Sequence, residues 1–112
     1  MRAPKLNRKL VLEEAQLAPD GSGGFTQNWV VKGTLWAAVD AGTGRERAGE
    51  SVTVSTVGYR IRVRAAPQGA PSRPRPEQRF RDGARLFLIS AVAEADEPGH
   101  YLTCFAQEEV LS

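Results

Sequence analysis

The chain contains few side chains that could act as a nucleophile, a general base or a metal ligand. His100 is its one histidine and Cys104 its one cysteine. A Ser/His/Asp triad needs a serine held next to the histidine, but His100 follows Pro98-Gly99, a sequence typical of an exposed turn. Cys104 lies in an alternating strand pattern, where a lone cysteine usually packs as a small apolar side chain. The sequence therefore offers no catalytic residues and disfavours an enzyme.

Two further motifs have the composition of ion-binding sites. Gly42-Thr43-Gly44 resembles part of a phosphate-binding loop, but it lacks the remaining glycine spacing and the Lys-Ser pair. Glu94, Asp96 and Glu97 could contact a hard cation, but they lack the ordered spacing of a calcium loop. One cysteine and one histidine form neither a zinc site nor an internal disulfide. We therefore expect no metal and no cofactor.

The arginines are the remaining candidates for binding. The chain has 15 Lys and Arg against 13 Asp and Glu, and this net charge of +2 creates little of the field expected of a dedicated nucleic-acid binder. Five arginines nevertheless follow one another on a predicted strand and connector: Arg60, Arg62, Arg64, Arg73 and Arg75. Aligned guanidinium groups bind phosphates, or they pair with acids of a neighbouring subunit, and both readings stay open. The aromatic residues are too few to form a base-stacking platform.

The apolar pattern that must position these residues predicts an all-β fold. Leu10 and Leu12 alternate with polar residues, as in a strand with one face on a core. Further strands are expected at residues 34–40, 52–63 with a bulge near 55–56, 79–81, 85–92 with both faces buried, and 101–106. Because closure removes exposed edges, we expect a small closed β-barrel of about six strands. Its expected core residues are Leu12, Trp36, Val39, Ile61, Phe87 and Ile89.

The length of 112 residues fits a single domain over residues 1–112. Between the strands we expect a glycine-rich turn at 20–24, one long projecting loop at 41–51 and a proline-rich connector at 65–78. Residues 107–112 form either a helical turn or a docking segment. There is no apolar run long enough for a signal peptide or a membrane span, so we expect no membrane contact and a cytoplasmic product.

An ordered set of motifs runs along the chain: Leu10-Val11-Leu12-Glu13, Asp20-Gly21-Ser22-Gly23-Gly24, Trp29, Gly33-Thr34-Leu35-Trp36-Ala37-Ala38-Val39, Gly44-Arg45-Glu46, Tyr59-Arg60-Ile61-Arg62-Val63-Arg64 and Arg79-Phe80-Arg81-Asp82-Gly83-Ala84-Arg85-Leu86-Phe87-Leu88-Ile89. This set resembles a known family, the head-tail joining or head closure proteins of long-tailed phages. The resemblance covers about residues 6–109. The alanine- and arginine-rich composition of the chain is also similar to that of the stopper subunit of gene transfer agents. The proline run from Pro67 to Pro76 departs from the family pattern.

The resemblance implies a structural neck protein that forms a homo-oligomeric ring of six or twelve copies in a virion or phage-like particle. The ring lies between the portal or head adaptor and the tail terminator or tail tube, retains the packaged double-stranded DNA and provides the docking platform for the tail. Assembly takes place in the bacterial cytoplasm. In the family the loop after the second strand projects into the channel, which implies that Arg45, Glu46 and Arg47 line or gate it. The alternative is a free nucleic-acid-binding β-barrel that acts through the five arginines above.

Overall fold

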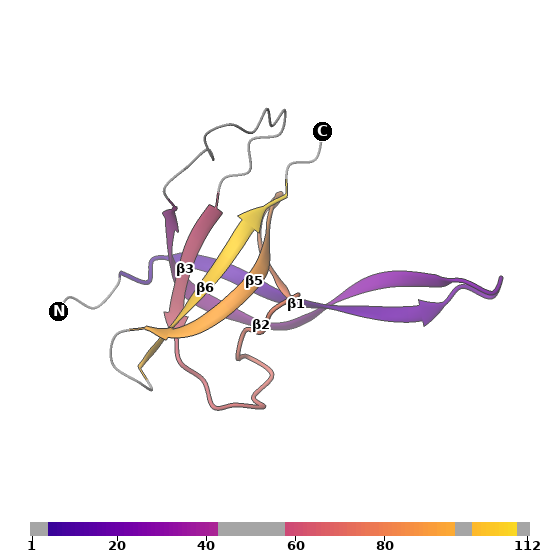
Figure 1. The fold of residues 1–112 in the computed structure, drawn as a ribbon, viewed down its shortest axis with the longest axis horizontal. Helices are drawn as coiled ribbons and strands as arrows, with labels where there is room; N and C mark the ends of the chain where they lie inside the picture. The colour runs from indigo at the N-terminus through magenta and orange to yellow at the C-terminus, as the bar shows by residue number, and fades with distance from the viewer. Residues whose placement is uncertain (1–4, 43–57, 96–99, 110–112) are drawn as a thin grey trace, which may run out of the picture.

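A computed structural model of the chain describes residues 5–42, 58–95 and 100–109. Within these residues every regular element is a β-strand (Figure 1). The strands are β1 (Arg8–Pro19), β2 (Phe25–Ala41), β3 (Gly58–Arg64), β4 (Arg79–Asp82), β5 (Arg85–Ala95) and β6 (Tyr101–Glu108). All neighbours are antiparallel, and their order around a closed barrel is β1-β2-β3-β6-β5-β4. The prediction of an all-β barrel of about six strands is confirmed.

The interior of the barrel is filled by apolar side chains on alternate residues of the strands. On β3, for example, Ile61 and Val63 are fully buried while Arg60 and Arg64 are exposed, as the twofold side-chain period of a strand requires. The buried cluster consists of Leu10, Leu12, Ala37, Ile61, Val63, Phe80, Phe87, Ile89, Leu102, Cys104 and Ala106. It therefore contains four of the six expected core residues, and Val39 packs against it half-buried.

Trp36 is the exception, and its assignment to the core is wrong. The side chain of Trp36 is 56% exposed, whereas its neighbour Ala37 is fully buried. Ala37 pairs with Arg8 on β1 and Val63 on β3, and this register points the alanine inward. Because successive residues of a strand face opposite sides, the tryptophan must then point outward.

The fifth strand also differs from its prediction, because only one of its faces is buried. Phe87 and Ile89 point into the core, but Leu88 between them is 38% exposed. The pairing with β6 shifts register between Ile89 and Ala91, as in a β-bulge that leaves Ser90 unpaired. The strand thus has the ordinary one-sided burial of a barrel wall rather than the two-sided burial of a covered sheet.

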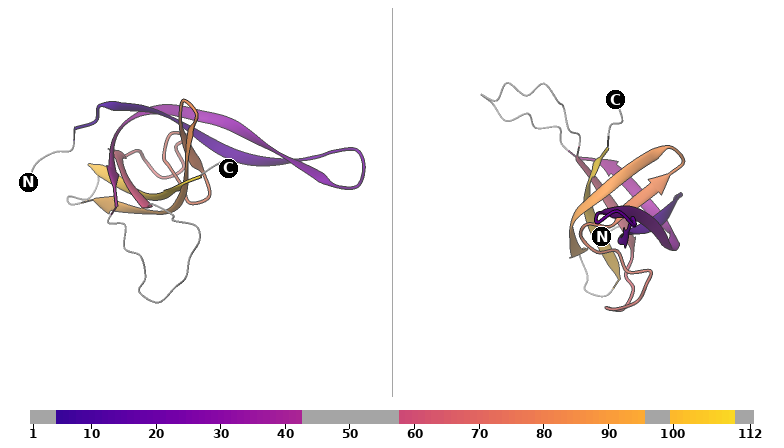
Figure 2. Two further views of the ribbon diagram at one scale, coloured as in Figure 1. Left: turned by 90° about the horizontal axis from the view of Figure 1, so that it is seen from above. Right: turned by 90° about the vertical axis from the view of Figure 1, so that its right-hand side faces the viewer.

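The first two strands continue beyond the barrel as a two-stranded arm, which we define as residues 14–31 (Figures 1 and 2). The strand expected at 34–40 is therefore much longer, since its first part pairs with the second half of β1 from Glu14 opposite Val30 to Pro19 opposite Phe25. Six paired residues at about 3.4 Å each make the arm about 20 Å long. A register shift between Leu12 and Glu13, opposite Lys32, marks the point where it leaves the barrel.

The connector at 65–78 contains turns and no strand, in agreement with its prolines. Gln78 attaches it to the barrel, because the Gln78 carbonyl oxygen accepts a hydrogen bond from Ile89 N at 2.9 Å. Near the C-terminus, Gln107 and Glu108 belong to β6, so the helical turn expected at 107–112 does not begin there. The bulge expected near 55–56 lies outside the described residues. Among the residues that the structure describes, none belongs to a helix long and apolar enough to cross a membrane.

Candidate functional site

One rim of the barrel carries the base of the expected projecting loop. The last residues of β2 pair with the first residues of β3, with Asp40 opposite Arg60 and Ala41 opposite Tyr59. Beyond this pair, the Gly42 N–H donates a hydrogen bond to the Gly58 carbonyl oxygen at 2.6 Å. The two residues that flank segment 43–57 therefore meet at a single point of the rim. Arg45, Glu46 and Arg47, the expected gating residues, lie in this segment and outside the described residues.

A cluster of charged and polar side chains connects three strands at the same rim. Arg85 of β5 donates two hydrogen bonds to the carboxylate of Glu108 on β6, from Nε at 2.8 Å and from Nη2 at 3.0 Å. Nη2 of Arg85 also donates to the hydroxyl of Tyr59 on β3, which itself donates to Glu108 at 3.2 Å. The hydrogen bonds from Arg85 lower the pKa of Glu108 and outweigh the opposing effect of burial.

The same cluster rests on an aromatic support. The rings of Tyr59 and Phe87 meet edge to face with centroids 5.1 Å apart, and the Arg85 guanidinium lies 4.9 Å from the centroid of Phe87. Tyr59 is also the first β3 residue after Gly58, where segment 43–57 ends. The base of the segment is thus held by paired backbone, a bidentate ion pair and packed aromatic rings, which makes it a rigid attachment point.

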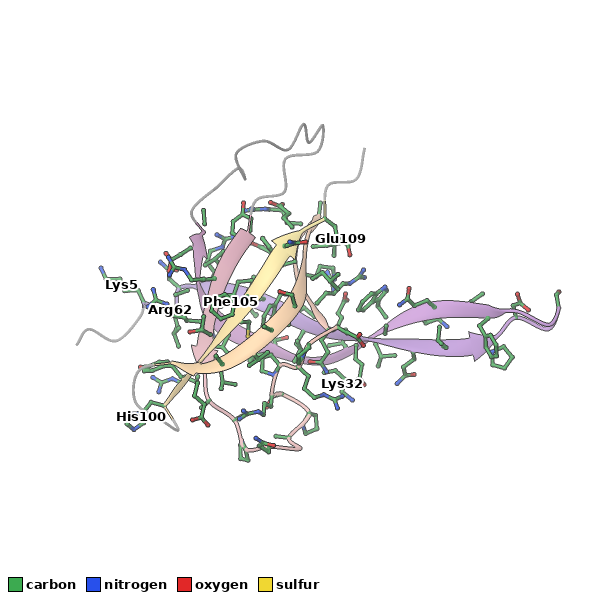
Figure 3. All side chains as sticks on the ribbon, viewed as in Figure 1. Lys5, Lys32, Arg62, His100, Phe105 and Glu109 are labelled. Carbon is green, nitrogen blue, oxygen red and sulfur yellow. The ribbon has the colours of Figure 1, made fainter. Side chains whose placement is uncertain are left out.

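The basic residues of β3 point outward, as their alternate spacing predicts. Arg60 and Arg64 are exposed, and Arg62 donates a hydrogen bond to Asp40 of the neighbouring strand at 2.8 Å (Figure 3). Like Arg62, both connector arginines bind groups of their own chain. Arg73 donates to the carbonyl oxygen of Ala66, and Arg75 forms an ion pair with Glu14. The five arginines therefore do not act as one uniform basic surface.

A second charged cluster, which the sequence analysis missed, fixes the base of the arm. Glu13 is 5% exposed and accepts hydrogen bonds from Nε of Arg79 at 2.8 Å and from Nε of Arg81 at 2.9 Å. Burial alone would raise the pKa of Glu13, but the two arginines reverse this and lower it. The guanidinium of Arg79 also lies 3.9 Å from the ring centroid of Trp29 on the arm, so the cluster joins β4 to both strands of the arm.

The adjacent carboxylate, Glu14, ties the arm to the connector. It forms ion pairs with Arg75 and with Lys32 at 3.6 Å, and it accepts a hydrogen bond from Nε2 of Gln78 at 3.2 Å. The side-chain oxygen of Gln78 in turn accepts a hydrogen bond from Arg75 N at 2.8 Å. These contacts fix the direction in which the arm leaves the barrel.

The residues considered first for catalysis are not gathered into a site. Cys104 is buried in the core, and this burial raises its pKa to about 12, far from the range of a reactive thiolate. His100 is exposed and lies in a turn. In the part of the chain that the structure describes, no three His, Cys, Asp or Glu residues are grouped so that they could hold a metal ion.

Comparisons with known proteins agree with this architecture. Residues 1–109 match the family model of the phage head completion protein. No curated protein matches the chain. Among solved structures, a chain from the "Virion of native gene transfer agent (GTA) particle" is 62% identical, with 98% of this chain and 100% of that chain covered and a TM-score of 0.81. The chain therefore belongs to the family of phage head completion proteins.

Proposed function

We propose that this protein closes the filled head of a phage-like particle as a ring at its neck, where it retains the packaged DNA and provides the surface on which the tail docks. The observation that carries the proposal is the 62% identity to a chain of a gene transfer agent virion over nearly the full length of both chains. The membership in the head completion family supports the same role.

The filled barrel determines where a DNA channel would lie. Phe80 and Phe87 are fully buried in the barrel interior together with the aliphatic core, which leaves no passage for a duplex through one subunit. A channel must therefore lie between subunits, along the axis of a ring of six or twelve copies. Symmetry repeats every charge of one subunit around such an axis, so that one arginine per subunit becomes a ring of positive charge even though the net charge of each chain is only +2.

The rim at Gly42 and Gly58 is the attachment point of the gate in this proposal. Segment 43–57 starts and ends there, next to the rigid cluster of Arg85 and Glu108. Arg45, Glu46 and Arg47 of the segment then line or gate the channel, and DNA or neighbouring subunits bias the segment between closed and open arrangements. The two arginines of each subunit contact phosphates, while Glu46 between them keeps the affinity for DNA low enough for the DNA to leave.

The outer surface of the ring then contacts the other neck components. On the head side these are the portal or head adaptor, and on the tail side the tail terminator or tail tube. The ring assembles in the bacterial cytoplasm and stays in the neck of the finished particle.

Electron microscopy of particles from a producer cell that lacks this gene tests the proposal. We expect tailless heads that have lost their DNA, and restoration of filled, tailed particles when the gene is supplied on a plasmid. Filled particles with normal tails from the deletion strain would refute a role in head closure and tail docking. The plasmid-complemented strain controls for effects of the deletion on neighbouring genes.

The second candidate, a free nucleic-acid-binding barrel, is favoured by one observation: Arg60, Arg62 and Arg64 share the outer face of β3. The hydrogen bond of Arg62 to Asp40 weakens it, since part of the positive charge is neutralised within the chain. This candidate predicts that the purified monomer binds duplex DNA with log K falling by about 0.9 per neutralised phosphate as log salt rises. A closure subunit shows little such binding before assembly.

A further inference from the structure

The arm has one apolar face and one polar face. Its pairing register places six apolar side chains on the same side, although none of them belongs to the barrel core. They are Ala15, Leu17, Pro19, Phe25, Trp29 and Val31, and Gln27, which pairs with Leu17, is the polar residue among them. Leu17 is 71% exposed, Phe25 68% and Val31 55%. The opposite face carries mainly polar side chains, such as Gln16, Thr26 and Asn28.

The arm also lacks the features that usually prevent the free edges of strands from pairing with other chains. Between Ala15 and Val31 the only charged residue is Asp20, in the turn, whereas 25% of the whole chain is charged. Beyond the barrel each strand of the arm pairs only with the other, so that both outer edges are open. Soluble proteins usually protect such edges with charges or with a covering element. An exposed, uncharged apolar face of this kind marks an interaction surface.

The arm is held rigidly at its base by Glu13 and Glu14, whose ion pairs with Arg79, Arg81 and Arg75 reach β4 and the connector. Asp20 orders the tip, because its Oδ1 accepts hydrogen bonds from the backbone N–H groups of Ser22 at 2.7 Å and Gly24 at 3.1 Å. A binding element that is ordered before it meets its partner loses less conformational entropy on binding.

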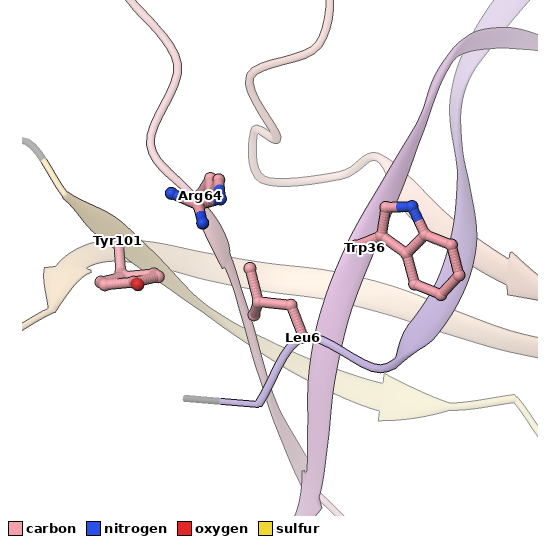
Figure 4. Close-up of a pocket in the computed structure, with 4 residues that line it drawn as sticks. All are labelled: Leu6, Trp36, Arg64 and Tyr101. Carbon is pink, nitrogen blue, oxygen red and sulfur yellow. The ribbon is translucent and has the colours of Figure 1, made fainter. Parts of the chain in front are cut away.

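A pocket of about 500 Å³ lies on the other side of the barrel from the arm tip. Its lining residues are Leu6, Trp36, Arg64 and Tyr101 (Figure 4). The exposed indole of Trp36 forms one wall, and the exposed Arg64 lies across from it. β3 ends at Arg64 and β6 begins at Tyr101. Figure 1 shows these two strand ends at the lower left of the barrel, while the turn of the arm lies at the opposite end of the long axis.

We propose that the apolar face of the arm tip docks into the Leu6/Trp36/Tyr101 pocket of a second copy of this chain, and that this contact joins neighbouring subunits of the ring. Phe25 and Leu17 supply the apolar surface that enters the pocket, and the single carboxylate of the tip, Asp20, meets the guanidinium of Arg64. The charges of the two surfaces are complementary. This inference rests on the proposed ring.

The positions of the two surfaces fit a ring rather than a symmetric pair. The arm tip and the pocket are different surfaces at opposite ends of one subunit, so their contact is heterologous. A pair of subunits joined in this way keeps one free tip and one free pocket. Repetition of such a contact makes a closed ring when the rotation between copies closes. A twofold dimer would instead need the same surface on both partners.

Cross-linking in assembled particles tests the contact directly. Phe25 and Trp36 lie on the same strand, eleven residues apart, which corresponds to about 36 Å at about 3.3 Å per residue. A short bis-maleimide therefore cannot join cysteines at these positions within one chain. With the Phe25→Cys/Trp36→Cys variant we expect a ladder of cross-linked species from the dimer up to the closed ring on a denaturing gel.

The matched control is the Thr26→Cys/Trp36→Cys variant, since Thr26 is exposed like Phe25 but lies on the polar face of the arm. The proposal is overturned if Phe25→Cys/Trp36→Cys gives no more cross-linked species than the two single-cysteine variants. It is also overturned if Thr26→Cys/Trp36→Cys gives a ladder of equal intensity. Cys104 is common to all variants and is buried, so it adds the same background to each.

A substitution test is independent of cross-linking. Phe25→Glu puts a charge on the apolar face at an exposed position, so the purified chain should keep its melting temperature. We expect particles with this variant to lose their DNA, and particles with Thr26→Glu to stay filled. Filled, tailed particles with Phe25→Glu would refute the arm contact.

The two proposals fail in different ways. Open, tailless heads from the deletion strain together with no ladder would refute the arm contact and leave the closure role. A full ladder together with normal particles from the deletion strain would refute the closure role and leave the contact between copies.

Discussion

Gly42 lies so close to Gly58 that a side chain at residue 42 would collide with the backbone. A Cβ built on Gly42 would lie 2.9 Å from the Gly58 carbonyl oxygen, the same atom that accepts the Gly42 N–H at 2.6 Å. A Cβ built on Gly58 would meet no atom within 4 Å. The two glycines at the base of segment 43–57 therefore differ in what they tolerate, although both belong to the same hydrogen bond.

This difference predicts opposite results for two alanine substitutions. Gly42→Ala should lower the free energy of unfolding by about 1–3 kcal/mol, because the new methyl group must push the backbone of residue 58 away. Gly58→Ala should leave stability unchanged or raise it by about 0.4–1 kcal/mol, since alanine restricts the unfolded chain. Urea unfolding of both purified variants measures the difference. Equal stability of the two variants would mean that the close approach does not occur in solution.

Trp36 and Phe80 predict a second contrast, between an exposed and a buried aromatic side chain. Trp36→Ala should change the free energy of unfolding by no more than about 0.5 kcal/mol, because this indole is 56% exposed. Phe80→Ala should cost about 3–5 kcal/mol, because its ring is fully buried. Thermal and urea unfolding of the purified chain compare the two. A large loss for Trp36→Ala in the isolated chain would contradict the outward direction of its side chain.

The error over Trp36 shows which part of the fold a single sequence predicts. Strand number, the closed barrel and most of the core follow from alternation, because Leu12, Ile61, Phe87 and Ile89 each lie in a clear twofold pattern. The run from Gly33 to Val39 is apolar on both faces, so alternation cannot select its inward side. The register with β1 and β3 selects it, and that register depends on the whole barrel.

The arm and its base were harder to predict for a related reason. Residues 26–28 are polar and pack on no core, so they show no alternation, and only the pairing with β1 makes them a strand. The partners of Glu13 are 66 and 68 residues away in sequence and meet it only when β4 closes the barrel onto β1. The resemblance to head closure proteins predicts a functional role for segment 41–51, and the structure adds the geometry of its base.

The ion pairs of Glu13 predict a loss of stability in acid. The pKa of Glu13 is lowered in the folded chain, so its contribution is fully present above its ordinary pKa near 4.5 and is lost as the pH falls through the lowered value. Glu13→Gln should therefore be less stable than the wild type by about 1–3 kcal/mol at neutral pH, with the difference shrinking in acid.

Melting temperatures measured from about pH 7 to about pH 3 test this dependence. Glu94→Gln, which removes one negative charge at an exposed position of β5, controls for the change in net charge. A difference between Glu13→Gln and the wild type that stays constant over the whole range would show that the carboxylate charge contributes nothing.

The buried thiol of Cys104 predicts slow chemical labelling. Burial raises its pKa to about 12, so almost no thiolate is present at neutral pH, and the side chain is fully enclosed in the core. An alkylating reagent should modify the native chain far more slowly than the chain unfolded in urea. Equal rates at low reagent concentration would mean that the barrel opens readily around β6.

The proposed gate predicts a separation between folding and DNA retention. Arg45→Ala/Arg47→Ala changes residues of segment 43–57 and leaves the barrel core untouched. The free energy of unfolding of the purified variant should therefore lie within about 0.5 kcal/mol of the wild-type value. Particles with this variant should assemble, because the arm and the pocket are unchanged, but they should lose DNA during purification. The matched control is Arg73→Ala, which removes an arginine that binds the carbonyl oxygen of Ala66 in the connector. Nuclease protection of particle DNA measures retention. Equal protection in the double variant and the wild type would show that these two arginines do not contribute to the gate.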